Sequence, residues 1–180
     1  MNQQIVLLQH ATLESERLLL RPFALTDAQD LYEINSDEET TRYIYPPHKT
    51  LEETENLLIN FFMQKPIGKY AIELKETGKM IGTLEMHLQH HNNSAEIGFT
   101  QNRAYWGNGY MTEAAKLVLD VAFNKLNLTR VYGGCDARNT ASGQTLQRIG
   151  MTHEGTFRKD HAFNGQYADS NYYSILKEEF

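Results

Sequence analysis

The hydrophobic and polar positions along the chain change their period several times, which indicates alternating strands and helices. The clearest helical pattern lies at residues 112–125, where apolar side chains keep i, i+3, i+4 spacing: Ala114, Leu117, Val118, Val121 and Ala122. Short apolar runs bounded by turn residues predict strands over 17–23, 69–75, 80–87, 94–100 and 130–136.

Three further helices are expected from their capping residues. Thr26 with Gln29, and Thr50 with Glu53, have the spacing of a capping box; they predict helices to about residue 35 and to a point before Pro66. Asn139 is a suitable N-cap for a helix that ends at Gly150. Residues 43–48, with two adjacent prolines, are expected to form a loop.

The end of the chain carries a hairpin signal, since Asn164-Gly165 lies between strand-like runs within residues 161–167. The predicted order is therefore strand, two helices, three strands, helix, strand, helix, hairpin. This mixture predicts an α/β (α+β) fold with a mixed, mostly antiparallel sheet and flanking helices. The absence of repeats and linkers in the sequence favours one domain over residues 1–180.

Composition narrows the class of protein. A length of 180 residues, with 41% hydrophobic and 22% charged positions, is ordinary for a globular domain. No apolar run approaches the length of a membrane span, and no signal peptide is apparent. Cys135 is the single cysteine, so a disulfide framework and a paired-cysteine zinc site are excluded, and a cytoplasmic location is expected. A net charge of −6 argues against nucleic-acid binding and mildly favours a cationic substrate.

The most informative segment is 94–115, a predicted strand followed by a glycine-spaced loop and a helix. Glycine lets the backbone approach a phosphate, and the first N–H groups of a helix have no internal partners. Gly107 and Gly109 therefore indicate an anion site, although an ordinary strand-to-helix turn explains the same spacing. The segment is not a P-loop, because Gly-Lys-Ser/Thr does not follow, and it lacks the third glycine of the dinucleotide fingerprint.

Several motifs, taken together, resemble the GNAT acetyltransferase superfamily, and specifically its RimJ/RimL branch of ribosomal-protein N-terminal acetyltransferases. They occur in the same order and at similar spacing over nearly the whole chain: ERLLLRP at 16–22, IGT at 81–83, AEIGF at 95–99, YWGNGYMTEA at 105–114, NTAS at 139–142 and IGM at 149–151. One position departs from the superfamily pattern. Ala104 stands where Gln or Arg is frequent, and the adjacent Arg103 offers an alternative positive charge.

The resemblance implies acetyl-CoA as the cosubstrate and a GNAT-like sheet whose central strand pair splays apart. The pantetheine arm of acetyl-CoA would pair with the strand at Ile97, Gly98, Phe99 and Thr100. The pyrophosphate would lie on the loop and first helical turn, at Trp106, Gly107, Asn108, Gly109, Tyr110, Met111 and Thr112, with Asn139 and Ser142 facing the pantetheine and the sulfur. The resemblance implies no metal, and it leaves a homodimer open.

Acetyl transfer needs a neutral amine and a proton for the departing thiolate. By the resemblance, Ser142 is the candidate proton donor, although a polar residue in a first helical turn is common. The resemblance also implies His161 as the candidate base, because it stands nineteen residues after Ser142, where some members of the branch carry a glutamate, and the pKa of histidine suits neutral pH. Glu85, on the strand before the polar loop, is the second candidate. Each of these two also has a simpler interpretation as a solvent-facing residue.

Other polar groups have weaker claims. Glu96 and Glu113 are interpreted as structural carboxylates, and His87, His90 and His91 as a solvated loop rather than a metal site. Tyr43, Tyr45 and His48 lie in a loop that, in the superfamily, borders the acceptor site. No neighbour is apparent that would lower the pKa of Cys135, so a covalent acyl-enzyme is not expected.

The sequence therefore predicts an N-acetyltransferase that acts by direct attack of a primary amine in a ternary complex. A protein N-terminal amine is the first candidate acceptor. A small amine (a polyamine, an aminoglycoside or an amino acid derivative) is the second, and a non-catalytic acyl-CoA-binding module is the third hypothesis.

Overall fold

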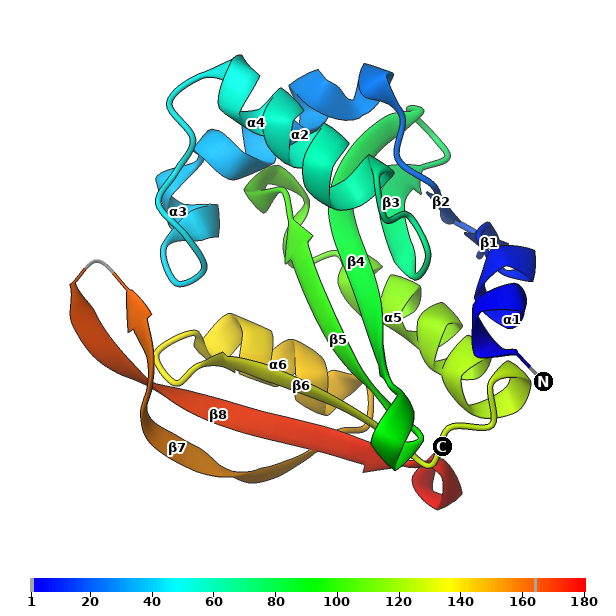
Figure 1. Cartoon of the computed structure of the whole chain (residues 1–180). Helices are drawn as coiled ribbons and strands as arrows, with labels where there is room; N and C mark the ends of the chain where they lie inside the picture. The colour runs from blue at the N-terminus through cyan, green and yellow to red at the C-terminus, as the bar shows by residue number, and fades with distance from the viewer. Residues whose placement is uncertain (1, 164) are drawn as a thin grey trace.

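A twisted sheet runs through the computed structural model, which describes residues 2–163 and 165–180 (Figure 1). In the described residues it has eight strands: β1 (Leu13–Glu14), β2 (Leu18–Arg21), β3 (Lys69–Leu74), β4 (Lys79–Gln89), β5 (Ser94–Gln101), β6 (Arg130–Asp136), β7 (Thr152–Phe163) and β8 (Gln166–Leu176). Their spatial order is β1-β2-β3-β4-β5-β6-β8-β7. Every neighbouring pair is antiparallel except β5 and β6, which are parallel. The predicted mixed, mostly antiparallel fold is confirmed.

The helices are short and cover both faces of the sheet. They are α1 (Gln3–Gln9), α2 (Ala28–Ser36), α3 (Glu38–Thr41), α4 (Leu51–Leu57), α5 (Tyr110–Asp120) and α6 (Thr140–Arg148). One π-helical segment, Leu58–Met63, continues α4, and another, Val121–Lys125, continues α5. Among the described residues, no helix has both the length and the apolar character that crossing a membrane requires.

Two apolar clusters hold the layers together. The larger joins α1, α5 and α6 to the strands from β2 to β8, and the smaller joins α2 and the end of α4 to β3 and β4. Met80 and Ile81 are adjacent in β4 but belong to different clusters, because successive side chains of a strand point to opposite faces. The sheet is thus buried on both sides at β3 and β4, which explains why these strands read as continuous apolar runs.

The central strands β5 and β6 separate part of the way along their length. They pair only at Ser94–Arg130, Ala95–Val131 and Glu96–Tyr132. Beyond that point, residues 97–101 of β5 pair with β4 alone, and residues 133–136 of β6 pair with β8 alone. Figure 1 shows the two strands together near the C-terminus and diverging toward the other end. The expected splay is confirmed, and it leaves one backbone edge of each strand unpaired with the other.

The capping box predicted at Thr26 is wrong. Thr26 lies inside a 3-10 turn, Leu25–Asp27, and α2 begins only at Ala28. The carboxylate of Asp27 accepts a hydrogen bond from the backbone N–H of Ala24 at 2.8 Å and also binds the guanidinium of Arg21 at 2.7 Å. Asp27 directly precedes α2, but its side chain bonds back to Ala24 and Arg21 and makes no capping bond to the helix.

The other predicted caps are confirmed. The hydroxyl of Thr50 accepts from the N–H of Glu53 at 3.2 Å, and the amide oxygen of Asn139 accepts from the N–H of Ser142 at 3.1 Å. The side chain of Glu53, however, accepts from the N–H of Lys49 rather than from Thr50, so only half of that capping box forms. Residues 43–48 lie outside helices and strands, as expected.

The largest difference from the sequence prediction lies at the ends of the chain. Helices α1 and α3 were not predicted, and the hairpin strands β7 and β8 extend far beyond the expected residues 161–167. Antiparallel pairing is present up to Phe163–Gln166. Of the predicted turn residues, Asn164 lies outside the described residues. These strands alternate little in hydrophobicity because β7 is an edge strand with many exposed side chains.

Candidate active site

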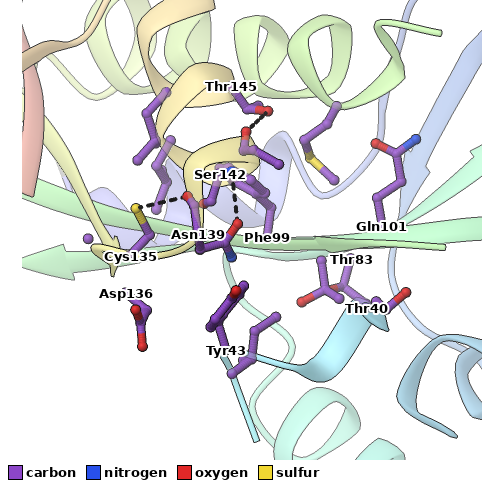
Figure 2. A pocket seen from close by; sticks show the side chains of 18 of the residues that line it. Thr40, Tyr43, Thr83, Phe99, Gln101, Cys135, Asp136, Asn139, Ser142 and Thr145 are labelled. Atoms are coloured by element: carbon purple, nitrogen blue, oxygen red, sulfur yellow. Dashed lines mark hydrogen bonds between the residues drawn. The ribbon is translucent and has the colours of Figure 1, made fainter. Parts of the chain in front are cut away.

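The separation of β5 from β6 opens a cleft of about 1180 Å³. Its wall includes residues of β4, β5, β6, α2, α5, α6 and the hairpin. Figure 2 shows that it reaches both faces of the sheet: Asn139 and Ser142 lie on one side of the strands, and Tyr43, Thr40 and Thr83 lie on the other. Two groups approaching from opposite faces can therefore meet between the strands.

At the α5 end, the backbone offers a run of free donors. The N–H groups of residues 107–112 find no acceptor in the described part of the chain. The amide of Trp106, which was also predicted to bind phosphate, already donates to the carbonyl of Arg103 at 3.1 Å. Free amides at the positive end of a helix form a site for an anion, and a run of this length suits a pyrophosphate better than a single phosphate.

The conformation of this loop depends on its glycines. Gly107 and Gly109 both have φ near +78°, a region that other residues rarely enter. The side chain of Asn108 holds the loop from inside, since its amide donates to the carbonyls of Tyr105 and Trp106, both at 3.1 Å. Asn108 therefore shapes the loop with its side chain while its own backbone N–H remains free.

An ion pair fixes the first turn of α5 against the N-terminal strands. Glu113 accepts from the guanidinium of Arg17 at 2.8 Å and from the hydroxyl of Ser15 at 2.6 Å. Burial by itself raises the pKa of Glu113, but these bonds outweigh it and leave the pKa below its ordinary value. Arg17 also lies over the ring of Tyr110 and donates to the carbonyl of Asn108. The structural interpretation of Glu113 agrees with these contacts.

Arg103 and Trp106 lie at the start of the loop, and each makes a contact that the sequence did not indicate. Arg103 is not part of the cleft wall; its guanidinium pairs with Asp37 at 3.0 Å, so it does not compensate for Ala104. The indole of Trp106 is 41% exposed at the cleft and donates to the carbonyl of Gln101 at 2.8 Å, which ties the loop to the end of β5.

Helix α6 brings Ser142 and Asn139 to the cleft beside Cys135 of β6 (Figure 2). The thiol of Cys135 donates to the carbonyl of Asn139 at 3.9 Å. Burial raises the pKa of the Cys135 thiol, and the hydrogen bond with Ser142 only partly offsets this. A protonated thiol is a poor nucleophile, which supports the expectation that no acyl-enzyme forms.

The position of α6 depends on a close contact at Gly143. A Cβ on Gly143 would lie 2.6 Å from the hydroxyl oxygen of Tyr173 on β8. We expect Gly143→Ala to lower the stability by about 1–3 kcal/mol, because overpacking forces neighbouring groups to move. Tyr173→Phe removes the clashing oxygen, so the double variant should regain most of the lost stability. Urea denaturation of the three variants measures this, and no recovery in the double variant would show that the clash is not the cause.

On the opposite face, His161 connects the hairpin to β6. Its Nδ1 lies 3.0 Å from the hydroxyl of Ser170, and its Nε2 lies 3.4 Å from a carboxylate oxygen of Asp136. The side chain of Asp136 is 1% exposed, and the bond from the Arg138 guanidinium holds the pKa of this carboxyl below its ordinary value. His161 is therefore oriented by groups on two strands rather than facing solvent freely.

The wall around His161 carries more negative than positive groups. Its carboxylates are Glu39, Glu85, Glu96, Asp136 and Asp160, while its only arginines among the described lining residues are Arg138 and Arg148. Arg138 is bound to Asp136 and lies 5.4 Å from the ring centre of Tyr43, across the mouth of the cleft. A surface of this sign attracts a cationic amine.

Glu85 lines the cleft, whereas the alternative interpretation from the sequence was a side chain that faces solvent. Its side chain is 16% exposed and accepts from His87 at 3.0 Å, if the histidine nitrogen Nε2 carries a proton. In the sheet Glu85 is the partner of Gly98 on β5, whose Cβ position is open. Glu85 thus lies next to the part of β5 that has separated from β6, across from its free edge.

Most of the predicted site residues meet in this one cleft. Ser142, His161 and Glu85 all line it, as do the predicted cofactor residues other than Asn108 and Tyr110. Tyr43 and Tyr45 line it too, whereas His48 is turned to the hydroxyl of Thr54 at 2.7 Å. Sequence reasoning missed Asn35, Asp136, Asp160 and Tyr172, which carry no motif, and it gave no role in the site to Thr83 of the IGT motif; all five line the cleft. Among the described residues, no group of three His, Cys, Asp or Glu is placed to hold a metal ion.

The fold and this cleft define a class of enzyme that comparisons with known proteins identify. Residues 17–152 match the family described as "Acetyltransferase (GNAT) domain", so the chain belongs to the GNAT acetyltransferases and is an acetyl-transferring enzyme. Enzymes of this family use acetyl-CoA as cosubstrate and act on amine acceptors.

Particular relatives agree with this assignment. The chain is 32% identical over 166 residues to "Uncharacterized N-acetyltransferase YnaD" of Bacillus subtilis (strain 168), covering 92% of this chain and 97% of that protein. A solved GNAT-family acetyltransferase from Bacillus anthracis has a TM-score of 0.85 and 30% identity, over 93% of this chain and 99% of the other. "Spermidine N(1)-acetyltransferase" of Escherichia coli (strain K12) is 24% identical, over 89% of this chain and 87% of that enzyme.

Proposed function

We propose that this enzyme transfers the acetyl group of acetyl-CoA to the α-amine of a protein or peptide N-terminus, as in the RimJ/RimL branch. The observation that carries the proposal is that one opening between β5 and β6 has a run of free amides at one end and a carboxylate-lined wall at the other. An anionic cosubstrate and a cationic acceptor are thereby directed to the same gap from opposite faces.

The free amides of residues 107–112 would hold the pyrophosphate, and the unpaired edge of β5 at Ile97–Thr100 would hold the pantetheine. Acetyl-CoA supplies the activated acetyl thioester. A backbone N–H on the free edge of β5 would stabilise negative charge on the thioester oxygen, since a fixed donor is worth more there than in water. The hydroxyl of Ser142 would give its proton to the departing sulfur.

On the acceptor side, His161 would take the proton of the amine, with Asp136 and Ser170 orienting its ring. An α-amine has a pKa near 8, so about a tenth of it is already neutral at pH 7 and a weak base is sufficient. Glu85 is the second candidate for this role. Placement of the two reactants in the cleft would supply a large part of the rate.

One observation favours a second candidate acceptor, a polyamine. The relative from Escherichia coli is named for acetylation of spermidine, and the carboxylates around the cleft would suit several positive charges. The two candidates differ in what lies beside the amine: a peptide carries a carbonyl group there, and a polyamine carries only methylenes and further amines.

The function is tested by release of free thiol from acetyl-CoA in the presence of N-terminal peptides, polyamines and aminoglycosides. Release with peptides is the expected result, with mass spectrometry locating the acetyl group on the α-amine. Release with polyamines alone would replace the acceptor but keep the chemistry. Binding of acetyl-CoA by calorimetry without release from any amine would reject the proposed reaction.

His161→Ala tests the proposed base. We expect kcat to fall about tenfold with a small change in KM. About a tenth of the amine is already neutral at pH 7, so a base can raise the reactive fraction by only about tenfold. His161→Glu should recover part of the loss. His153→Ala is the matched control: this histidine is on the same strand β7, packs on Tyr173 and does not line the cleft. Equal kcat for His161→Ala and His153→Ala would remove His161 from the mechanism.

A further inference from the structure

The inner wall of the cleft, beyond the catalytic gap, is formed by α2, the end of α4 and β4. We call it the α2 wall and define it by Leu31, Asn35, Leu57, Phe62 and Thr83. It is mostly apolar, and Thr83 is the partner of Thr100, so the wall adjoins the part of β5 that has separated from β6. A group attached to an amine bound beside that part of β5 would therefore extend toward this wall.

Asn35 is the exceptional residue of the α2 wall. It is 1% exposed, and its backbone carbonyl accepts from the N–H of His48 at 2.9 Å. Its side-chain oxygen accepts from the hydroxyl of Tyr45 at 2.7 Å. Its side-chain nitrogen Nδ2, however, has no hydrogen-bond partner among the described residues. A buried donor without an acceptor destabilises a folded protein, and most native structures avoid one.

The hydrogen bond from Tyr45 leaves the amide nitrogen of Asn35 as the free atom. Burial, followed by the charge of Glu85, raises the pKa of the Tyr45 hydroxyl, so the hydroxyl stays protonated and is able to donate. The amide oxygen of Asn35 is occupied by that donor, and the free atom is an N–H group. The α2 wall therefore contains a buried hydrogen-bond donor in apolar surroundings, whereas carboxylates line the outer wall.

Resting on the proposed function, we propose that Nδ2 of Asn35 donates to the carbonyl oxygen next to the reacting amine, so that the enzyme selects α-aminoacyl acceptors over polyamines. A peptide N-terminus or an amino acid amide has a carbonyl group one carbon from its amine. The amine nitrogens of a protonated polyamine are donors only and give Asn35 nothing to bind. The carboxylates attract both kinds of amine, so the discrimination falls to Asn35.

The test compares two acceptors that differ in the carbonyl group: alanine N-methylamide and 2-aminobutane. The measured quantity is the ratio of their kcat/KM values from thiol release by the full chain. This ratio is compared between proteins, because the different basicity of the two amines then cancels. Asn35→Leu should lower the ratio about tenfold relative to the wild type, as expected for the loss of one buried hydrogen bond.

Two further variants separate recognition from structure. Tyr45→Phe keeps Asn35 but frees its amide to turn, and should lower the ratio by a smaller factor. Asn124→Leu replaces an exposed amide that bonds to Asp120 on α5, outside the cleft, and should leave the ratio unchanged. If Asn35→Leu does not fold, Tyr45→Phe alone decides, and a ratio equal to that of the wild type rejects the proposal.

The outcomes distinguish this inference from the proposed function. A ratio in Asn35→Leu within twofold of the wild-type ratio, with thiol released from both amines, rejects the role of Asn35 and leaves the acetyltransferase reaction intact. An equal loss of kcat/KM for both amines shows that Asn35 is structural and also rejects it. No release from any amine by the wild-type enzyme rejects the proposed reaction, and the inference with it.

Discussion

Replacing Gly107 by valine should weaken acetyl-CoA binding about 30-fold, which corresponds to about 2 kcal/mol of backbone strain and lost amide contacts. Gly107 has φ of +78°, where a β-branched residue is a genuine outlier. A Cβ at this position meets no atom within 4 Å, so the effect does not arise from a clash. It arises because the loop must change its conformation and the amides of residues 107–112 then no longer converge. Isothermal calorimetry with acetyl-CoA measures the change.

Gly78 provides a matched control for this strain. It also has positive φ, of 68°, with no atom within 4 Å of its Cβ position, but it lies in the turn between β3 and β4 and does not line the cleft. Gly78→Val should lose a similar amount of stability and bind acetyl-CoA with unchanged Kd. Equal Kd values for Gly107→Val and the wild type would reject the loop as the pyrophosphate site.

Replacing Ser142 by alanine should lower kcat about 100-fold, within the range expected for the loss of a positioned proton donor. The helix itself should persist, because Asn139 caps it through the backbone N–H of residue 142, which alanine retains. The Kd for acetyl-CoA should therefore change little. Thiol release at saturating substrate measures kcat, and calorimetry measures Kd.

Thr145→Val is the control on the same helix. Thr145 also lines the cleft, one turn after Ser142, but its hydroxyl is already donated to the carbonyl of Ala141 at 3.0 Å (Figure 2). Its replacement should change kcat less than threefold. A loss in Thr145→Val as large as that in Ser142→Ala would mean that the packing of α6, and not proton donation, controls the rate.

The candidate site also shows how an acidic enzyme accommodates a highly anionic cosubstrate. The positive groups near the loop are occupied: Arg17 by Glu113, and Arg103 by Asp37. Under the proposed function, backbone amides and the dipole of α5 would therefore carry the anion site without adding net charge. The carboxylates of the cleft wall would then serve the acceptor, so that electrostatics would separate the two substrates.

The sequence by itself determined the features that depend on local chemistry. The Thr50 and Asn139 caps, the glycine loop before α5 and most strands followed from residues within a few positions of one another. The family resemblance extended this to the splay of β5 and β6 and to Ser142 and His161, and the position of Glu85 on its strand made it the second candidate base; all three side chains line the cleft. The capping box at Thr26 failed because this residue lies inside a 3-10 turn, where Asp27 bonds to Ala24 and Arg21, and the capping pattern alone does not contain these contacts.

Only the tertiary structure decided the composition of the acceptor wall. Asn35, Tyr45, Glu85, Asp136 and His161 come from four separate parts of the chain, and none of them belongs to a common motif. Whether a side chain donates freely or is occupied depends on partners that folding brings from a distance, as the Arg17–Glu113 and Arg103–Asp37 pairs show. The residues proposed for the reaction can thus be found from short segments of the sequence. The residues proposed to select the acceptor can be found only from contacts between distant segments.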